Sequence, residues 1–387
     1  MTEMVFGAAP SRAGDPIIPK YWRTVDRWSL ACVLALFLMG LLLGLAASVP
    51  LAERNNQPTF YYVTRQAVFG GMALAVMVIF SMMSPRQVRR LGVIGFMISF
   101  AIVLMLPWIG TDFGKGATRW LSLGFTSIQP SEFLKPGFVI FGAWLLAAGQ
   151  SVGGPPGKTF SFILTGIVCT VLALQPDFGQ AALIGVSWGV MYFVAGAPII
   201  VLLVAVAIAA AGGIYAYGAS PHFAGRINGF LSPEVDPHTQ LGYAANAIQQ
   251  GGFFGVGVGE GTVKWSLPDA HTDFIIAVAA EEYGLAIVLV IIALYGTIVF
   301  RSLMRLLRET DMFTRIAGTG LACAFGAQAL INMAVAARLV PAKGMTLPFV
   351  SYGGSSVLAS GIALGMLLAL TRYRPQGKMA SLIGRGG

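Results

Sequence analysis

The chain has 387 residues, of which 56% are hydrophobic and only 11% are charged, and its mean hydropathy is +0.75. Soluble globular domains carry about 25% charged residues. The composition therefore excludes a soluble domain and indicates a polytopic membrane protein. The net charge of +9 does not indicate a nucleic-acid partner, because in a membrane protein the placement of the cations matters more than their sum.

Ten apolar stretches have the length of a membrane-spanning helix, about 17–25 residues. The sequence thus predicts an all-α fold in which residues 28–371 form ten transmembrane helices, between a tail at 1–27 and a tail at 372–387. The first 26 residues lack the features of a cleaved signal peptide, so the first span is expected to be a retained anchor. The expected spans are residues 28–49, 62–83, 92–110, 131–149, 159–174, 178–196, 198–217, 274–299, 315–336 and 351–371.

The distribution of lysine and arginine predicts the orientation. Most of these residues lie in the two tails and in the loops on the same side, which the positive-inside rule places in the cytoplasm. The loops at 111–130, 218–272 and 337–350 then face outward. The loop at 218–272, between the seventh and eighth helices, is long enough to carry short helices of its own.

The transition from this loop into the eighth span carries the most informative residue. Asp273 ends the string Pro268-Asp269-Ala270-His271-Thr272-Asp273 and precedes an apolar run that begins at Phe274. A carboxylate at the mouth of a membrane helix is costly and usually functional. We interpret Asp273 as a catalytic residue, although it could also cap the helix.

Two further carboxylates, Glu281 and Glu282, lie within the same apolar run, about 12 Å farther along a straight helix at about 1.5 Å per residue. They are expected inside the bilayer. They could support catalysis or form a buried structural network with Lys135 or Arg119.

Other polar residues also gather on the outer side. Glu132 and Lys135 are spaced as one helical turn and could pair. Alternatively, Arg119 and Lys135 hold an anionic head group, since guanidinium and ammonium groups both bind phosphate, and Trp120 lies beside them. Asp177, which follows the helix-breaking Pro176, could cap the next helix or support the site.

A third group precedes the tenth span. Ser355 and Ser356 lie at an expected helix N-terminus, which is a ready anion site or an ordinary serine cap. Arg338 and Lys343 come shortly before them. Gln240 lies in the long outer loop. The predicted site therefore has Asp273 as its catalytic residue and includes no metal ligand. The residues predicted to bind substrate are Arg119, Trp120, Lys135, Gln240, Arg338, Lys343, Ser355 and Ser356. The residues predicted to support the site are Glu132, Asp177, Glu281 and Glu282.

These groups suit a lipid-linked sugar pyrophosphate. Its phosphates would bind the cations, its lipid tail would lie between helices, and its sugars would occupy the loop. A carboxylate could accept a proton from a sugar hydroxyl, while cations stabilise the departing pyrophosphate. The residues alone favour a membrane enzyme that acts on lipid phosphates.

At these residues the chain resembles the SEDS family of bacterial membrane proteins (shape, elongation, division and sporulation), over roughly residues 20–375. The resemblance implies ten transmembrane helices and a peptidoglycan glycosyltransferase that polymerises lipid II in the cytoplasmic (inner) membrane. It also implies a class B penicillin-binding transpeptidase as partner, and it maps the family's essential aspartate to Asp273 and its essential outer tryptophan to Trp120. The matching strings are residues 271–276, 281–284, 341–356, 119–121 with 129–132, and 175–179.

The string from Lys343 to Pro348 resembles the division-specific member of the family, which implies a role at the septum with other division proteins. An elongation-specific polymerase is the alternative within the family, and a lipid II flippase or a recruiting scaffold are alternatives of other classes. The expected reaction is an inverting transfer that releases undecaprenyl pyrophosphate, without a metal or assisted by a divalent cation, Mg²⁺ or Mn²⁺. Ala117-Thr118 departs from the family, where a second basic residue before Arg119 is common.

Overall fold

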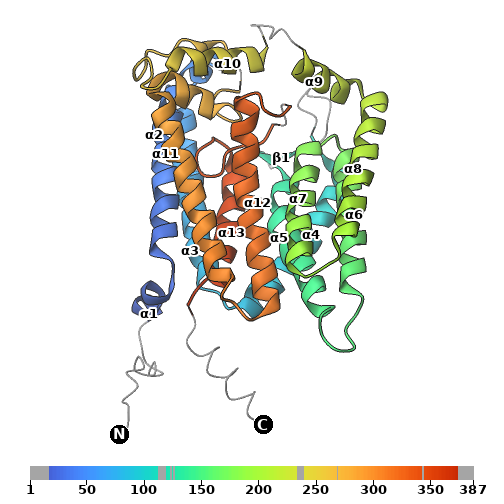
Figure 1. The fold of residues 1–387 in the computed structure, drawn as a ribbon. Coiled ribbons are helices and arrows are strands. Elements are labelled where there is room, and N and C mark those ends of the chain that lie inside the picture. The colour runs from blue at the N-terminus through green and yellow to red at the C-terminus, as the bar shows by residue number, and fades with distance from the viewer. Residues whose placement is uncertain are drawn as a thin grey trace.

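The structure is a computed structural model that describes residues 17–111, 119–122, 124, 127–232, 239–267, 269–341 and 344–373. Apolar helices stand side by side and form the body of the protein (Figure 1). Within this described part of the chain, eight helices are long and apolar enough to cross a membrane, and α7 and α13 are shorter apolar helices. They are α2 (Arg27–Arg54), α3 (Tyr61–Ser81), α4 (Pro85–Ile109), α5 (Pro130–Ala148), α6 (Gly157–Leu174), α7 (Phe178–Val194), α8 (Ile199–Ala219), α11 (Ile275–Leu306), α12 (Met312–Ala336) and α13 (Gly354–Leu370).

Each expected span coincides with one of these helices, which confirms an all-α polytopic membrane fold. The number of helices that cross the bilayer and their orientation stay predictions. The largest differences in bounds are at α11, which ends at Leu306 rather than at residue 299, and at α4, which begins at Pro85 rather than at residue 92. A capping box between Ser84 and Gln87 starts the helix, so its first turn is polar and lies outside the apolar run.

A short helix, α1 (Ile17–Thr24), lies within the predicted N-terminal tail. The end of the described chain meets it: the Tyr373 N–H donates to the Thr24 carbonyl at 3.1 Å, and Arg372 Nε donates to Thr24 Oγ1 at 3.0 Å. Both ends of the described chain therefore lie at the same end of the bundle, as an even number of spans requires.

The long loop contributes α9 (Pro221–Leu231), α10 (Gln240–Gly251) and the 3-10 helix η1 (Val263–Trp265). Figure 1 shows α9 and α10 at the end of the bundle opposite to α1. A small antiparallel pair, β1 (Leu121–Ser122) with β2 (Ser127–Ile128), precedes α5. The expectation that the loop carries short helices is confirmed.

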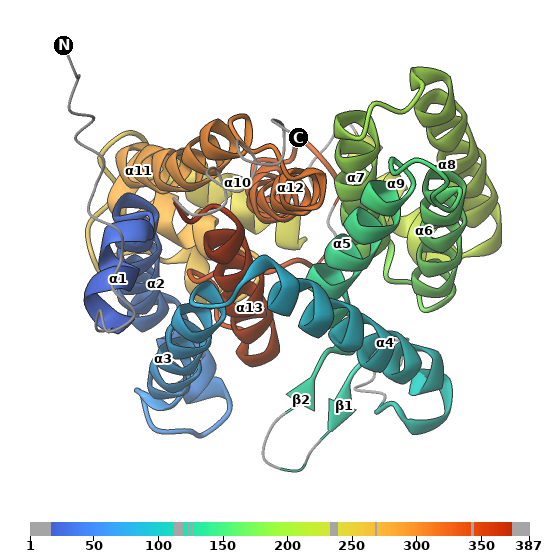
Figure 2. The ribbon, with the colours of Figure 1, turned by 90° about the horizontal axis from the view of Figure 1, so that it is seen from below.

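Glycines allow several helices to approach one another closely, as in many membrane bundles. A Cβ added at Gly361 of α13 would lie 2.5 Å from the Ala73 carbonyl oxygen of α3, and one added at Gly320 of α12 would lie 2.5 Å from Met191 Sδ of α7. In the view from below, α12 and α13 lie near the centre and α8 lies at the edge (Figure 2). Helix α8 has no buried residue.

Helix α11 is broken at Gly284, whose φ of 79° and ψ of −179° are not helical. The backbone groups freed at the break bind the loop after α10: the Leu285 N–H donates to the Gly252 carbonyl at 3.0 Å, and the Val256 N–H donates to the Glu281 carbonyl at 2.9 Å. The straight helix expected from residue 274 is therefore wrong. Residues 285–306 alone are long enough to cross a bilayer, at about 1.5 Å per residue.

The segment at 344–352 inserts into the bundle. Gln66 Nε2 of α3 donates to the carbonyls of Val350 at 2.9 Å and Gly40 at 3.1 Å, and Gly40 lies at the middle of α2. Tyr295, in the middle of the spanning part of α11, donates its hydroxyl to the Pro348 carbonyl. These bonds satisfy backbone groups that would otherwise be unpaired at membrane depth. The expectation that all of 337–350 is an outer loop is corrected, and the late start of α13 explains its short length.

Candidate functional site

Asp273 lies in a turn that precedes α11. The Asp269 carbonyl accepts the N–H groups of Thr272 and Asp273, both at 3.2 Å, and of Phe274 at 3.3 Å. The N-cap of α11 is Phe274, so Asp273 does not occupy the N-cap position that the capping alternative requires. Its side chain is half-buried, and a Cβ added at Gly344 would lie 3.5 Å from Asp273 Oδ2.

Two amides of α12, one turn apart, hold the inserted segment beside this turn. Asn332 Nδ2 donates to the Asp273 carbonyl at 2.9 Å and also to the Met345 carbonyl. Gln328 Nε2 donates to the Thr346 carbonyl at 3.0 Å. The backbone position of the predicted catalyst is therefore set by α12 and by the inserted segment together.

The same segment binds the turn a second time. The Tyr352 N–H donates to the His271 carbonyl at 2.9 Å, and Ser351 Oγ donates to the Thr272 carbonyl. The strings around 271–273 and 344–352, which are about 70 residues apart in the chain, thus form one structural unit.

Ser355 and Ser356 follow in the first turn of α13, and both are buried. Gly353 occupies the N-cap and no side chain caps the helix, so the serine-cap alternative is wrong. Ser356 Oγ shares a hydrogen bond with Thr346 Oγ1. Lys343 lies outside the described residues, and the substrate-binding role of both serines stays a prediction.

Arg338 is placed away from the inserted segment. It has a positive φ of 56°, and its Nη2 donates to the Ser232 carbonyl at 2.6 Å, just past the end of α9. In this structure Arg338 links α12 to α9.

Arg119 binds the turn between α6 and α7. Its Nε donates to the Gln175 carbonyl at 3.0 Å and its Nη2 to the Pro176 carbonyl at 2.6 Å. Trp120, the next residue, is half-buried, and its carbonyl accepts the Thr111 N–H at 2.8 Å. The charge of Arg119 is thereby fixed in position.

Asp177 lies in this same turn and is buried. It makes no capping hydrogen bond to α7; its Oδ2 accepts Ser131 Oγ at 3.0 Å and Gln129 Nε2 at 3.3 Å. Burial raises the pKa of Asp177 above its usual range, against the opposing charge of Arg119. Asp177 therefore joins α5 to α7 rather than capping a helix.

Glu132 and Lys135 form a buried ion pair at 2.7 Å. Lys135 Nζ also donates to Gln328 Oε1 at 2.7 Å, and Gln180 Nε2 donates to Glu132. Lys135 is only 7% exposed. Its geometry favours the ion-pair interpretation over the binding of a phosphate.

Glu281 and Glu282 pair neither with Lys135 nor with Arg119, so that expectation is wrong. Glu281 Oε1 accepts the N–H groups of Thr262 at 2.7 Å and Val263 at 2.9 Å. Glu282 forms an ion pair with Lys264 at 2.5 Å. Both carboxylates anchor the long loop to α11, so their charges are bound by groups of that loop.

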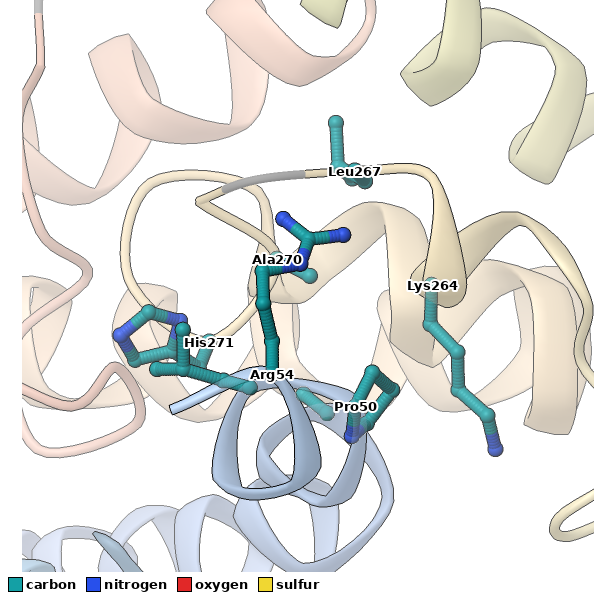
Figure 3. A pocket seen from close by; sticks show the side chains of 8 residues that line it. Pro50, Arg54, Lys264, Leu267, Ala270 and His271 are labelled. Carbon is teal, nitrogen blue, oxygen red and sulfur yellow. The ribbon is translucent and has the colours of Figure 1, made fainter. Parts of the chain in front are cut away.

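The loop near Lys264 also packs on the end of α2. A cavity of about 10 Å³ lies between them, and Figure 3 shows Arg54, Lys264 and His271 around it, with their polar ends directed apart. Arg54 donates to the Trp265 carbonyl at 3.0 Å. A space of this size holds about one water molecule, so it is too small for a sugar.

A second cavity, of about 210 Å³, lies between α9 and α10. One of its residues, Gln240, was expected in the site, and its Nε2 donates to Asp269 Oδ2 at 2.9 Å. Another lining residue, Arg226, was not predicted from the sequence. A single arginine close to two glycines in the long loop could have indicated an anion-binding position. The lining residues are Gly225, Arg226, Gly229, Thr239, Gln240 and Leu241.

Arg226 lies within the electrostatic influence of several predicted site residues. Burial lowers the pKa of the Arg226 guanidinium, and the positive charge of Arg119 lowers it further, while Asp273 and Asp177 act in the opposite direction. Arg226 is thus near enough to both groups of site residues to feel their charges. Among the described residues, no three His, Cys, Asp or Glu side chains gather to hold a metal ion.

A model of the FtsW, RodA and SpoVE family, described as cell cycle proteins, matches residues 27–376. The chain belongs to the SEDS family. It is 42% identical to a protein of Caulobacter vibrioides named "Probable peptidoglycan glycosyltransferase FtsW", over 94% of each chain. A protein of the same name from Trichlorobacter lovleyi is 35% identical, over 92% of this chain and 94% of its own.

Solved structures of other SEDS proteins share the fold. One, described as "Structural coordination of polymerization and crosslinking by a peptidoglycan synthase complex", has a TM-score of 0.73 and 28% identity, over 90% of this chain and 99% of that chain. The rod shape determining protein RodA of Thermus thermophilus has a TM-score of 0.68 and 27% identity, over 91% of this chain and 99% of its own.

Proposed function

We propose that this chain is a peptidoglycan glycosyltransferase that polymerises lipid II during cell division, in the inner membrane at the septum. A class B penicillin-binding transpeptidase and other division proteins are its partners. Membership of the SEDS family and the 42% sequence identity to a protein named FtsW support the activity and the division role.

The observation that carries the catalytic assignment is the position of Asp273. Its turn is held by Asn332 and by the inserted segment, on the side of the bundle that carries α9 and α10. A general base must be held in a defined geometry, and this turn is bound from two sides.

In the proposed reaction, the 4-hydroxyl of the acceptor GlcNAc attacks C1 of the donor MurNAc, and Asp273 accepts the hydroxyl proton. The bond from C1 to the pyrophosphate breaks with inversion, and undecaprenyl pyrophosphate leaves. Arg119 contributes positive charge toward the leaving group, where developing negative charge needs it most. Arg338, Lys343 and the first turn of α13 remain candidates for further substrate contacts.

The decisive experiment is polymerisation of lipid II by the purified protein together with its transpeptidase partner. Asp273→Asn is expected to fold and to make no glycan polymer. Glu260→Gln, which alters an exposed carboxylate of the same loop, is the matched control and should polymerise as the wild type does. Normal polymer from Asp273→Asn would remove the catalytic assignment.

Two further assays separate the alternatives. Rescue of septation in a division-depleted strain supports the division role, whereas rescue of cell elongation alone would assign an elongation polymerase. Transport of labelled lipid II in proteoliposomes that persists in Asp273→Asn, without polymer from the wild type, would make the chain a flippase.

A further inference from the structure

We infer that Arg226 of α9, together with the cavity between α9 and α10, forms a binding site for the diphosphate group of a lipid-linked substrate or product. This inference deepens the proposed function and rests on it. It concerns a residue that the sequence motifs do not contain.

The first observation is the cavity itself. It measures about 210 Å³ and lies where the loop helices cover the bundle. Gly225 and Gly229 lie one turn apart on its α9 wall, and an added Cβ at either would meet nothing within 4 Å. Glycine destabilises a helix relative to alanine, so two glycines here leave open space and lower the stability of the helix.

The second observation is that a ring contact anchors α9 at the start of α7, next to the turn that Arg119 binds. The ring of Phe223 lies 4.6 Å from that of Phe178, at the start of α7, directly after Asp177. Arg226 is one helical turn from Phe223 and so lies on the same face of α9.

The far end of α9 is also held. Arg338 donates to the Ser232 carbonyl, and Tyr217 donates its hydroxyl to Asn228 Oδ1 at 2.8 Å. The position of Arg226 is therefore set by contacts at both ends of its helix.

The third observation concerns the guanidinium. No hydrogen bond or ion pair of Arg226 occurs among the described residues, although the side chain is half-buried. It lies within the field of a second cation, Arg119, and of the carboxylates Asp177 and Asp273. Desolvation and the charge of Arg119 both disfavour the Arg226 cation, against the attraction of the two carboxylates, and a bound anion would stabilise it further.

The two arginines suit the two phosphates of a diphosphate. Arg119 donates hydrogen bonds from Nε and Nη2 to backbone carbonyls, so it supplies positive charge from a fixed position. Arg226 keeps its planar fork of N–H donors, which matches phosphate oxygens in a bidentate manner. Gln240, on the opposite wall, connects the cavity to the Asp269 turn that carries Asp273.

The test measures binding rather than polymerisation. Purified full-length protein is titrated with inorganic pyrophosphate and with undecaprenyl pyrophosphate, with undecaprenyl monophosphate as the single-phosphate comparison. Arg226→Gln should weaken binding of both diphosphates by about tenfold or more, the usual effect of losing a charged hydrogen bond. Arg226→Lys should recover part of the affinity, because it keeps the charge but not the fork.

Two matched controls accompany these variants. Arg308→Gln removes the same charge from an exposed residue after α11 and should bind as the wild type does. Gly229→Leu fills the cavity without altering charge and should weaken undecaprenyl pyrophosphate binding, whereas Gly218→Leu, at an exposed glycine of α8, should not.

Binding by Arg226→Gln equal to that of the wild type would overturn the inference. A loss limited to inorganic pyrophosphate would overturn the assignment to a lipid substrate. Asp273→Asn should retain diphosphate binding. Failure of the wild type to polymerise lipid II while the Arg226 effect persists would reject the proposed function and keep the diphosphate site.

Discussion

Asn332 donates a hydrogen bond to the backbone carbonyl of Asp273 at 2.9 Å, and its same nitrogen binds the carbonyl of Met345. One buried amide thus joins the turn of the predicted catalyst to the segment that follows α12 and inserts into the bundle. Residues far apart in the chain reach one site because α12 carries this side chain between them.

Asn332→Leu is expected to lower both stability and polymerisation. It leaves two carbonyls without their donor, and each buried unpaired group costs about 1–3 kcal/mol. Thermal unfolding in detergent and the polymerisation rate measure the two effects. Gln328→Leu, one turn away, loses contacts to Thr346 and Lys135 but none to Asp273, so it should lower stability with a smaller effect on rate. A wild-type rate in Asn332→Leu would contradict the positioning role.

Gly284→Ala is expected to disrupt the part of α11 that binds the loop after α10. An added Cβ would lie 2.2 Å from the Phe253 carbonyl oxygen, and φ is 79°. Backbone must move, which predicts a large loss of folded protein in size-exclusion chromatography and in thermal unfolding. Gly296→Ala on the same helix meets nothing within 4 Å and should be tolerated or slightly stabilising. Equal behaviour of the two variants would exclude the break at Gly284 as a structural requirement.

Lys264→Met is expected to cost about 3–5 kcal/mol of stability, because it leaves the Glu282 carboxylate buried without its partner. The variant that combines Lys264→Met with Glu282→Leu should recover most of this loss, since the uncompensated charge is then absent. Chemical or thermal unfolding of the two single variants and the double variant forms a double-mutant cycle. Additive losses would show that the ion pair is not coupled in solution.

Asp26 predicts a pH dependence at the opposite end of the bundle. Burial alone would raise the pKa of Asp26, but the bonds and charges of Arg301 and Arg305 outweigh it, and the pKa lies below its ordinary value of 3.8. The ion pair to Arg301 at 2.9 Å therefore stabilises the fold above pH 3.8 and is lost as the pH falls through the lowered pKa.

Asp26→Asn should lower the free energy of unfolding by about 1–3 kcal/mol at neutral pH. The difference in the free energy of unfolding between Asp26→Asn and the wild type should become smaller as the pH falls below about 4. Thermal unfolding across this range measures it, with Glu53→Gln, an exposed carboxylate, as control. A difference that does not change with pH would assign the effect to the cap that Asp26 forms with the Trp28 N–H rather than to its charge.

Local sequence was enough to predict the helices and the residues of the Asp273 string. Hydrophobic length decides whether a segment can be an apolar helix, and each expected span coincides with one helix. The same length argument failed at α11, because it treats an apolar run as straight, and Gly284 breaks it where loop carbonyls and N–H groups replace the helical bonds.

Which polar groups meet was decided only by the tertiary structure. Glu282 pairs with Lys264 rather than Lys135, Gln66 holds the inserted Val350 carbonyl, and Arg226 comes into the electrostatic range of Asp273. The physical reason is that hydropathy is a property of a short segment, whereas the partner of a buried charge or carbonyl depends on which distant elements pack against it. The sequence by itself determined the membrane architecture and the chemical groups available, and packing decided how those groups are combined into a site.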